Sequence, residues 1–171
     1  MQASVFREEV LQKLTALHVS YTLHQHPAVH SMDDCLSLPF VTSDMVFAKN
    51  LLLETPTRDR RILLMLPPWK PFKTSVVSKL LHVSRLSFAS PEVMTQTMFT
   101  RPGALSPLGL LAEPARGTML AIDCQIMTYN QIAMHPCDAT ETVTMPMLDF
   151  LSILVPALEC PYVALNIPET P

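Results

Sequence analysis

Glycine is scarce in this sequence, and its scarcity excludes several classes of function. The chain has 3 glycines among 171 residues. No GxGxxG, GxxxxGK[ST] or GxSxG motif occurs, so nothing supports a dinucleotide site, a P-loop or a serine hydrolase of the nucleophile-elbow type. With so few glycines, we expect each to occupy a backbone position that only glycine fits.

Long hydrophobic runs and high charge are also absent. No segment reaches the ~18 uninterrupted apolar residues of a membrane span, and residues 1–13 carry Arg7 and Glu8 where a signal peptide would be apolar. Charged residues make up 16% and hydrophobic residues 49%, which excludes charge-driven disorder. We expect a cytoplasmic protein, and 171 residues indicate a single domain spanning 1–171.

Cysteines at metal-type or redox-type spacing are missing. The sequence has four widely spaced cysteines: Cys35, Cys124, Cys137 and Cys160. Without a CxxC pair, they are expected to be reduced and mostly buried. His24, His26 and His30 precede Cys35, but His26-Pro27 is typical of a turn and the HxH spacing is not that of zinc ligands. No metal site is predicted.

Positive charge is concentrated in one segment, although the net charge is −3. Residues 58–101 contain eight basic and two acidic side chains, so this segment carries +6 and the remainder −9. The basic residues are Arg58, Arg60, Arg61, Lys70, Lys73, Lys79, Arg85 and Arg101. Such a face can bind a phosphate backbone, or it can be an ordinary solvated surface. Charge alone leaves both interpretations open.

Short strands and helices are predicted to alternate along the chain, because 16 prolines limit the length of each element. Apolar spacing predicts helices at 4–17, 31–39 and 74–81, another starting at Ser90-Pro91, and a last one opening at Pro146 with Leu148, Leu151 and Leu154 inward. Strands are predicted at 19–23, 46–54, 62–66, 86–88, 118–123, 131–135 and 140–144. The interleaving favours a mixed α/β domain over a doubly wound one.

Lys49 and Asn50 interrupt the most apolar of these strands. An unpaired lysine is expensive to bury, so Lys49 is expected to open into a pocket and to meet an anion there. The alternative is a lysine whose ammonium reaches solvent at a strand edge.

The segment from Pro102 to Leu110 is predicted to be a rigid loop. Its sequence, PGALSPLGL, combines prolines that fix φ with glycines that permit close approach of a ligand. Such a loop can present backbone amides to a substrate, or it can be an ordinary turn between a helix and a strand.

Five blocks of the chain, taken in order, resemble the YbaK/prolyl-tRNA editing domain family. They are HPAVHS from His26, AKNLLL from Ala48, RLSFAS from Arg85, PGALSPLGL from Pro102, and His135-Pro136. The third and fourth look most like the freestanding branch that deacylates alanine mischarged onto proline tRNA, and the resemblance runs from about Val5 to Leu154. After His135-Pro136 the chain departs from the family's HPLTNTAT-like pattern and reads CDATET.

The resemblance implies a pseudo-barrel of mixed strands flanked by helices, and hydrolysis of the ester between an amino acid and the terminal adenosine of tRNA. The substrate's own ribose 2′-hydroxyl would help to position or activate water, while the protein supplies a pocket lined by donors. No metal or cofactor is implied. The implied partners are the acceptor end of mischarged proline tRNA and, as a candidate, prolyl-tRNA synthetase, with neither membrane nor DNA.

The resemblance also implies roles for individual residues. Lys49 would contact the terminal phosphate or ribose, the backbone at Gly103 would face the aminoacyl group, and His135 would close the pocket. The implied substrate-binding residues are Asn50, Arg85, Ala104, Ser106 and Pro107. Three alternatives remain open: a tRNA-binding paralogue without catalysis, a deacylase that prefers Cys, Ser or Thr, and a hydrolase of another small ester or amide.

Overall fold

Two mixed β-sheets form the centre of this computed structural model, which describes residues 3–169. One sheet has the strand order β1-β8-β7-β2 and the other β5-β3-β4-β6-β9. The strands of the first are β1 Thr22–Gln25, β2 Met45–Phe47, β7 Gln131–Met134 and β8 Glu141–Pro146. Those of the second are β3 Lys49–Glu54, β4 Arg61–Leu66, β5 Ser87–Phe88, β6 Met119–Asp123 and β9 Tyr162–Leu165. Each sheet contains parallel and antiparallel pairs, so the predicted mixed α/β class is confirmed.

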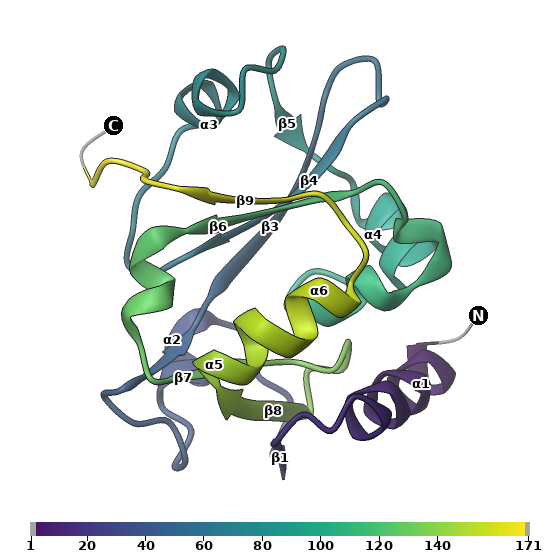
Figure 1. Cartoon of the computed structure of the whole chain (residues 1–171), viewed down its shortest axis with the longest axis vertical. Coiled ribbons are helices and arrows are strands. Elements are labelled where there is room, and N and C mark those ends of the chain that lie inside the picture. The colour runs from purple at the N-terminus through teal and green to yellow at the C-terminus, as the bar shows by residue number, and fades with distance from the viewer. Residues whose placement is uncertain (1–2, 170–171) are drawn as a thin grey trace.

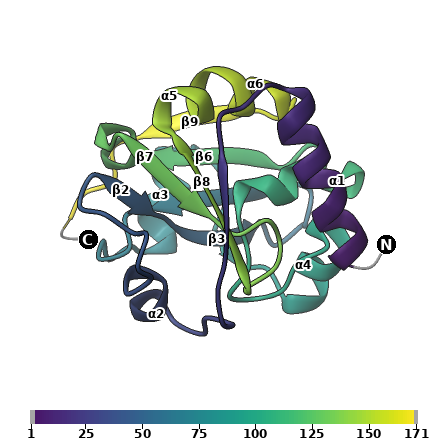
Figure 2. The ribbon, with the colours of Figure 1, turned by 90° about the horizontal axis from the view of Figure 1, so that it is seen from below.

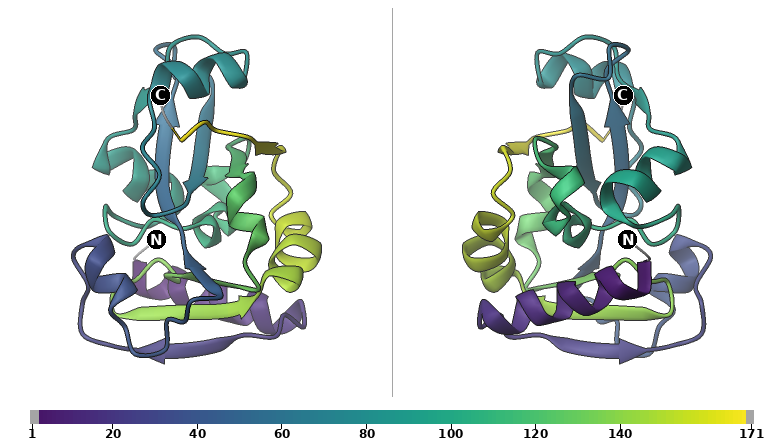
Figure 3. Two further views of the ribbon diagram at one scale, coloured as in Figure 1. Left: turned by 90° about the vertical axis from the view of Figure 1, so that its left-hand side faces the viewer. Right: turned by 90° about the vertical axis from the view of Figure 1, so that its right-hand side faces the viewer.

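Helices surround the two sheets (Figure 1). The larger ones are α1 Ala3–Ala16, α2 Met32–Leu36, α3 Thr74–Leu80 and α4 Pro91–Met98, followed by the continuous run α5 Met147–Asp149, the π-helical η4 Phe150–Leu154 and α6 Val155–Ala157. Three 3₁₀ segments complete the set: η1 Pro107–Leu111, η2 Glu113–Ala115 and η3 Cys124–Thr128. The molecule tapers from a broad base with β1, β8, α1 and α2 to a narrow end at α3 (Figure 3). None of the described helices is long and apolar enough to cross a membrane.

The chain passes from one sheet to the other at Ala48. The sequence predicts one strand over 46–54, whereas the structure has two, with β2 paired to β7 and β3 paired to β4. In the view from below, β2 lies beside β7 in the four-stranded sheet, whereas β3 belongs to the five-stranded sheet (Figure 2). Lys49 and Asn50 therefore lie at the seam between the sheets, directly after the crossing.

The central strand β4 is buried on both faces because two apolar clusters pack against it. Leu63 and Met65 face the cluster that contains Leu14 of α1 and Phe150 of the last helical run. Ile62, Leu64 and Leu66 face a second cluster with Val77 of α3. The side chains of β4 beyond Arg61 are almost wholly buried, so this strand is the rigid support for its neighbour β3.

In the C-terminal part of the chain, one predicted inward residue is wrong and one strand was not predicted. Leu154 is buried as predicted and Leu151 is partly buried, but Leu148 is 73% exposed, and the helical run buries Met147 and Phe150 in its place. The run is apolar on several sides, so spacing alone does not decide which face turns inward. No pattern in the sequence predicted β9, which pairs in parallel with β6.

Lys70 does not belong to a basic surface. Its side chain is 1% exposed, and Nζ donates to Asp123 Oδ2 at 2.8 Å and to the carbonyl oxygen of Ile167 at 2.7 Å. The lysine thus ties the loop after β4 to the end of β6 and to the segment after β9. The predicted charge of the 58–101 segment is correct by count, but one of its eight lysines and arginines is internal.

The glycines agree with the sequence predictions, whereas only two of the four cysteines are buried. All four cysteines are free, and Cys35 and Cys137 are buried, although Cys124 is exposed. Gly103 has φ +93°, in the region that favours glycine. A Cβ at Gly109 would lie 2.9 Å from Met98 Cβ, so η1 packs against α4 at a distance that only glycine allows.

Candidate functional site

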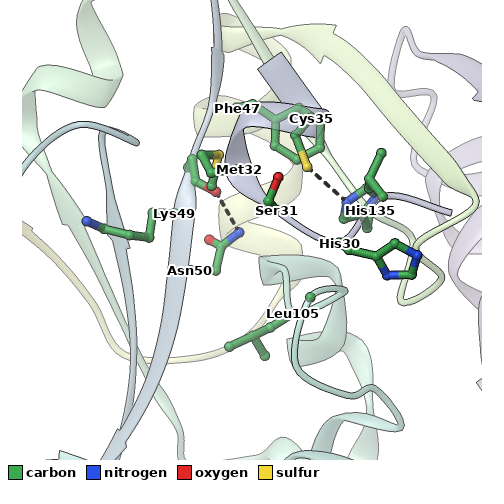
Figure 4. A pocket seen from close by; sticks show the side chains of 12 residues that line it. His30, Ser31, Met32, Cys35, Phe47, Lys49, Asn50, Leu105 and His135 are labelled. Atoms are coloured by element: carbon green, nitrogen blue, oxygen red, sulfur yellow. Dashed lines mark hydrogen bonds between the residues drawn. The ribbon is translucent and has the colours of Figure 1, made fainter. Parts of the chain in front are cut away.

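A cavity of about 150 Å³ lies between α2, the β2–β3 crossing, the loop before η1 and the end of β7. Its walls therefore come from both sheets. Side chains from these separate elements surround it, among them Cys35, Phe47, Asn50 and His135 (Figure 4). The lining residues are Val29, His30, Ser31, Met32, Cys35, Phe47, Ala48, Lys49, Asn50, Gly103, Leu105 and His135. Three predicted catalytic residues, Lys49, Gly103 and His135, are thus brought to one place.

His135 follows β7 and is held from two sides. Its ring Nδ1 lies 2.7 Å from the carbonyl oxygen of Glu141, and since a carbonyl can only accept, Nδ1 carries the hydrogen. Ser106 Oγ donates to the backbone carbonyl of His135 at 2.6 Å. Burial lowers the pKa of His135, which favours the neutral ring with a lone pair on Nε2.

That lone pair faces the thiol of Cys35. Sγ lies 3.8 Å from His135 Nε2, and the tautomer makes the thiol the donor. Cys35 reaches this place because Ser31 and Asp34 form a capping box that starts α2 one turn earlier. Burial raises the pKa of the Cys35 thiol to about 11, so it is a neutral donor in the cavity wall and a poor nucleophile.

Asn50 contributes an unpartnered acceptor. Its Nδ2 donates to the carbonyl oxygen of Ala48 at 3.1 Å, and this bond fixes the amide across the chain crossing. Its Oδ1 is buried and has no hydrogen-bond partner. A buried carbonyl oxygen without a donor is costly, so a ligand that donates a hydrogen there would be favoured.

Lys49 lines the cavity, but its ammonium points away from Asn50, Cys35 and His135 (Figure 4). Nζ donates to the carbonyl oxygen of Lys70 at 2.7 Å and lies 6.0 Å from the centre of the Phe72 ring. Burial lowers the pKa of Lys49. The predicted anionic partner is replaced in this structure by a backbone acceptor, and two of the three hydrogens of the ammonium remain for a ligand.

The PGALSPLGL segment is less exposed than a substrate-binding loop was expected to be. Gly103 is exposed and lines the cavity together with Leu105. Ala104 is 1% exposed and Ser106 0%, and Pro107 is buried at the start of η1. Ser106 contacts His135 and caps η1 through the amide of Leu108, so its position is that of a support for the cavity wall.

Arg85 is not brought to the cavity. It is exposed in the segment between α3 and β5, which lie at the upper end of Figure 1, whereas α2 lies at the lower end. Among residues with described side chains, no group of three or more His, Cys, Asp or Glu could hold a metal ion. His24 and His26 contact Thr144 and Thr142 of β8 instead.

Sequence reasoning missed Cys35, Phe47 and Met32 as cavity residues. The capping-box pattern at Ser31 was visible, and it places Cys35 one turn along α2 on the inner side. Phe47 precedes the crossing and packs 5.0 Å from the His135 ring, centre to centre. No local signal shows that a strand changes sheets, so Phe47 could not be assigned to a wall.

Comparisons with known proteins identify the family of the chain. The family model described as aminoacyl-tRNA editing domain matches residues 26–153. Prolyl-tRNA editing protein ProX of Acetoanaerobium sticklandii is 24% identical over 148 residues, which cover 86% of this chain and 90% of ProX. Prolyl-tRNA synthetase associated domain-containing protein 1 of Danio rerio is 24% identical over 151 residues, which cover 86% of this chain and 80% of that protein.

Solved structures share the fold. The crystal structure of the hypothetical protein APE2540 superposes with a TM-score of 0.72 at 12% identity, over 92% of this chain and 97% of that one. A protein proposed to be a trans-editing enzyme for prolyl tRNA synthetase superposes with a TM-score of 0.71 at 13% identity, over 95% of this chain and 98% of that one. The family match spans most of the chain and includes all the residues that line the cavity, and the chain therefore belongs to the aminoacyl-tRNA editing domain family.

Proposed function

We propose that this chain is a trans-editing deacylase that removes alanine mischarged onto proline tRNA. Family membership supports the reaction class, and the names of the two relatives connect that class to prolyl-tRNA. The observation that carries the choice of a small amino acid is the cavity itself. About 150 Å³ holds a molecule the size of benzene, and the amino group, α-carbon and ester of the substrate would share this space with the side chain, so little room is left for the side chain.

Size selection is the proposed basis of specificity. A binding site gains only about 1–3 kcal/mol from one methylene group, but a wall that clashes with a larger side chain can discriminate further. Phe47, Met32 and Leu105 supply such a wall around the aminoacyl side chain. Alanine would fit, whereas the ring of proline would meet these side chains.

The proposed roles at the ester follow from the donors and acceptors of the cavity residues that have no partner within the protein. Asn50 Oδ1 would accept from a ribose hydroxyl of the terminal adenosine, which satisfies its buried oxygen. Lys49 would use its remaining hydrogens on the terminal phosphate or ribose. The backbone at Gly103 would face the ester, and the substrate's 2′-hydroxyl would help to position the attacking water.

His135 is proposed to shape the cavity. Its Nδ1 is bound to the Glu141 carbonyl and its Nε2 faces Cys35, so both ring nitrogens already have partners. The ring would close the wall beside the aminoacyl group, and no metal would be required.

The decisive experiment is the release of labelled alanine from mischarged proline tRNA by the purified chain. We expect release from alanyl-tRNA and much slower release from correctly charged prolyl-tRNA. Seryl-, cysteinyl- and threonyl-tRNA measured in parallel test the other small substrates. Comparable rates on prolyl-tRNA would refute size selection.

One variant in the cavity and one control variant on the surface test whether the activity belongs to the cavity. Asn50→Ala should lower deacylation by at least ~100-fold, the scale of losing one preorganised polar contact. Asn166→Ala changes an exposed asparagine after β9 and should leave the rate unchanged. Binding of tRNA without release of alanine would instead indicate a non-catalytic paralogue, and hydrolysis of small esters without any preference for tRNA would indicate a different hydrolase.

A further inference from the structure

We propose that Trp69 and Tyr129 form a stacking platform for the unpaired nucleotides that precede the terminal adenosine of tRNA. The proposal rests on the proposed tRNA substrate and adds a subsite beside the cavity. Its ligand class is single-stranded RNA, bound through base faces and so with little dependence on base identity.

Trp69 is the chain's single tryptophan, and it is 61% exposed. The ring of Tyr129, at the end of η3, lies 6.4 Å from it, centre to centre, with 54° between the planes. The two rings come from segments 60 residues apart in sequence and meet at the surface. Trp69 is exposed and Tyr129 is half-buried, so the tyrosine supports the tryptophan ring while the free faces remain available for bases to stack on.

The loop that carries Trp69 is held rigidly. Pro67, Pro68 and Pro71 fix φ around it. The next residue, Lys70, is buried and bound to Asp123 and to the carbonyl of Ile167. Because the backbone on both sides of Trp69 is fixed, ordering the loop on binding costs little, which is the advantage of a preorganised site.

The platform is joined to the cavity through Lys49. Its Nζ donates to the carbonyl oxygen of Lys70, the residue after Trp69, and lies 6.0 Å from the Phe72 ring centre. Asn50, the next residue along β3, faces the cavity (Figure 4). A cation beside an aromatic ring, between the platform and the cavity, is a combination that single-stranded nucleic acid sites use.

Intrinsic fluorescence tests the platform directly, because Trp69 is the only tryptophan. The probe is an uncharged RNA trinucleotide with the sequence CCA, titrated into the wild-type protein, with a blunt RNA duplex as the control ligand. We expect saturable quenching by the trinucleotide and a Kd raised at least about 5-fold in Tyr129→Ala. Unchanged fluorescence at trinucleotide concentrations that inhibit deacylation would overturn the proposal.

Kinetics supply the second test. Trp69→Ala should raise KM for alanyl-tRNA by about 5-fold to 100-fold, and Trp69→Phe should restore most of the loss. Trp69→Ala should hydrolyse the alanyl ester of adenosine at the wild-type rate, because that substrate lacks the nucleotides that precede the terminal adenosine. Leu148→Ala, at a 73% exposed apolar side chain on the last helical run, is the control and should change neither value.

The outcomes separate this proposal from the proposed function. Quenching by the trinucleotide without any deacylation supports the platform and refutes the deacylase. Deacylation with an unchanged KM in Trp69→Ala refutes the platform and leaves the deacylase standing. Fluorescence that responds to prolyl-tRNA synthetase and not to RNA would overturn the platform in favour of a protein-docking surface.

Discussion

The buried pair of Lys70 and Asp123 is expected to be the most sensitive electrostatic contact in the described structure. Lys70→Met leaves the Asp123 carboxylate, 0% exposed, without its cation at 2.8 Å, and leaves the carbonyl of Ile167 without a donor. Removing one partner of a buried ion pair costs about 3–5 kcal/mol. For a chain of this length, each kcal/mol shifts Tm by roughly 2–4 °C, so we expect Tm to fall by about 6–20 °C.

The double variant separates the charge from the packing. Adding Asp123→Asn to Lys70→Met removes the uncompensated charge and keeps an oxygen for the amide of Gln125, which Asp123 caps at 2.9 Å. We expect this second change to restore about 2 kcal/mol or more of the free energy of unfolding, measured by urea denaturation. Lys79→Met, at an exposed lysine of α3, is the matched control and should stay within about 0.5 kcal/mol of wild type. The reasoning fails if Lys70→Met costs less than about 1 kcal/mol, or if the two changes destabilise additively.

Two further predictions concern residues of the cavity, one concerns the basic surface and one concerns packing. Lys49→Ala should lower deacylation by at least ~100-fold and lower stability by no more than about 1 kcal/mol, whereas a destabilised variant with normal turnover would make Lys49 structural. Because burial lowers the pKa of His135 from 6.5, the unfolded chain binds more protons below about pH 6.5, so the free energy of unfolding should fall as pH drops from there. Denaturation at several pH values should show a weaker fall in His135→Gln. If arginines such as Arg85 contact tRNA phosphates, log K should fall with log salt by roughly 0.7–0.9 per contact, and Arg85→Glu should weaken binding without changing the amino acid released. Gly109→Ala should destabilise by about 1–3 kcal/mol in a thermal melt, because the new Cβ meets Met98; a neutral effect would mean that α4 and η1 can separate freely.

Sequence patterns predicted the fold where the relevant information is local. The hairpin of β3 and β4, the capping box of α2 and the start of α4 at Ser90-Pro91 all depend on nearby residues, and the structure has each of them. The crossing at Ala48 was not predictable, because an apolar run looks the same whether it stays in one sheet or passes to another. Leu148 was misplaced for a related reason, since a helix that is apolar on several sides has no unique inward face.

The candidate site was predictable in its location and less so in its geometry. The resemblance to the editing domain family implied one site for Lys49, Gly103 and His135, and all three line the cavity. Spacing could not show that the ammonium of Lys49 turns to the Lys70 carbonyl, because that acceptor lies 21 residues away. Spacing also could not show that the hydroxyl of Ser106, which looks like a substrate-binding group, donates to the backbone carbonyl of His135.

The placement of the cavity at the junction of the two sheets has a consequence for the order of folding. β3 and β4 are joined by a short turn and can pair early, whereas β1 pairs with β8 through partners as far apart as Thr22 and Thr144. Contacts between such distant segments form slowly, because the entropy cost of closing a long loop comes before any stabilising contact is made. The cavity needs the β2–β3 crossing and the end of β7 in place together, so a chain emerging from denaturant should regain its hairpin and its apolar collapse well before it can bind an aminoacyl group. We therefore expect the cavity to form in one of the last steps of folding, so that a partly folded chain lacks a pocket that can hold a ligand.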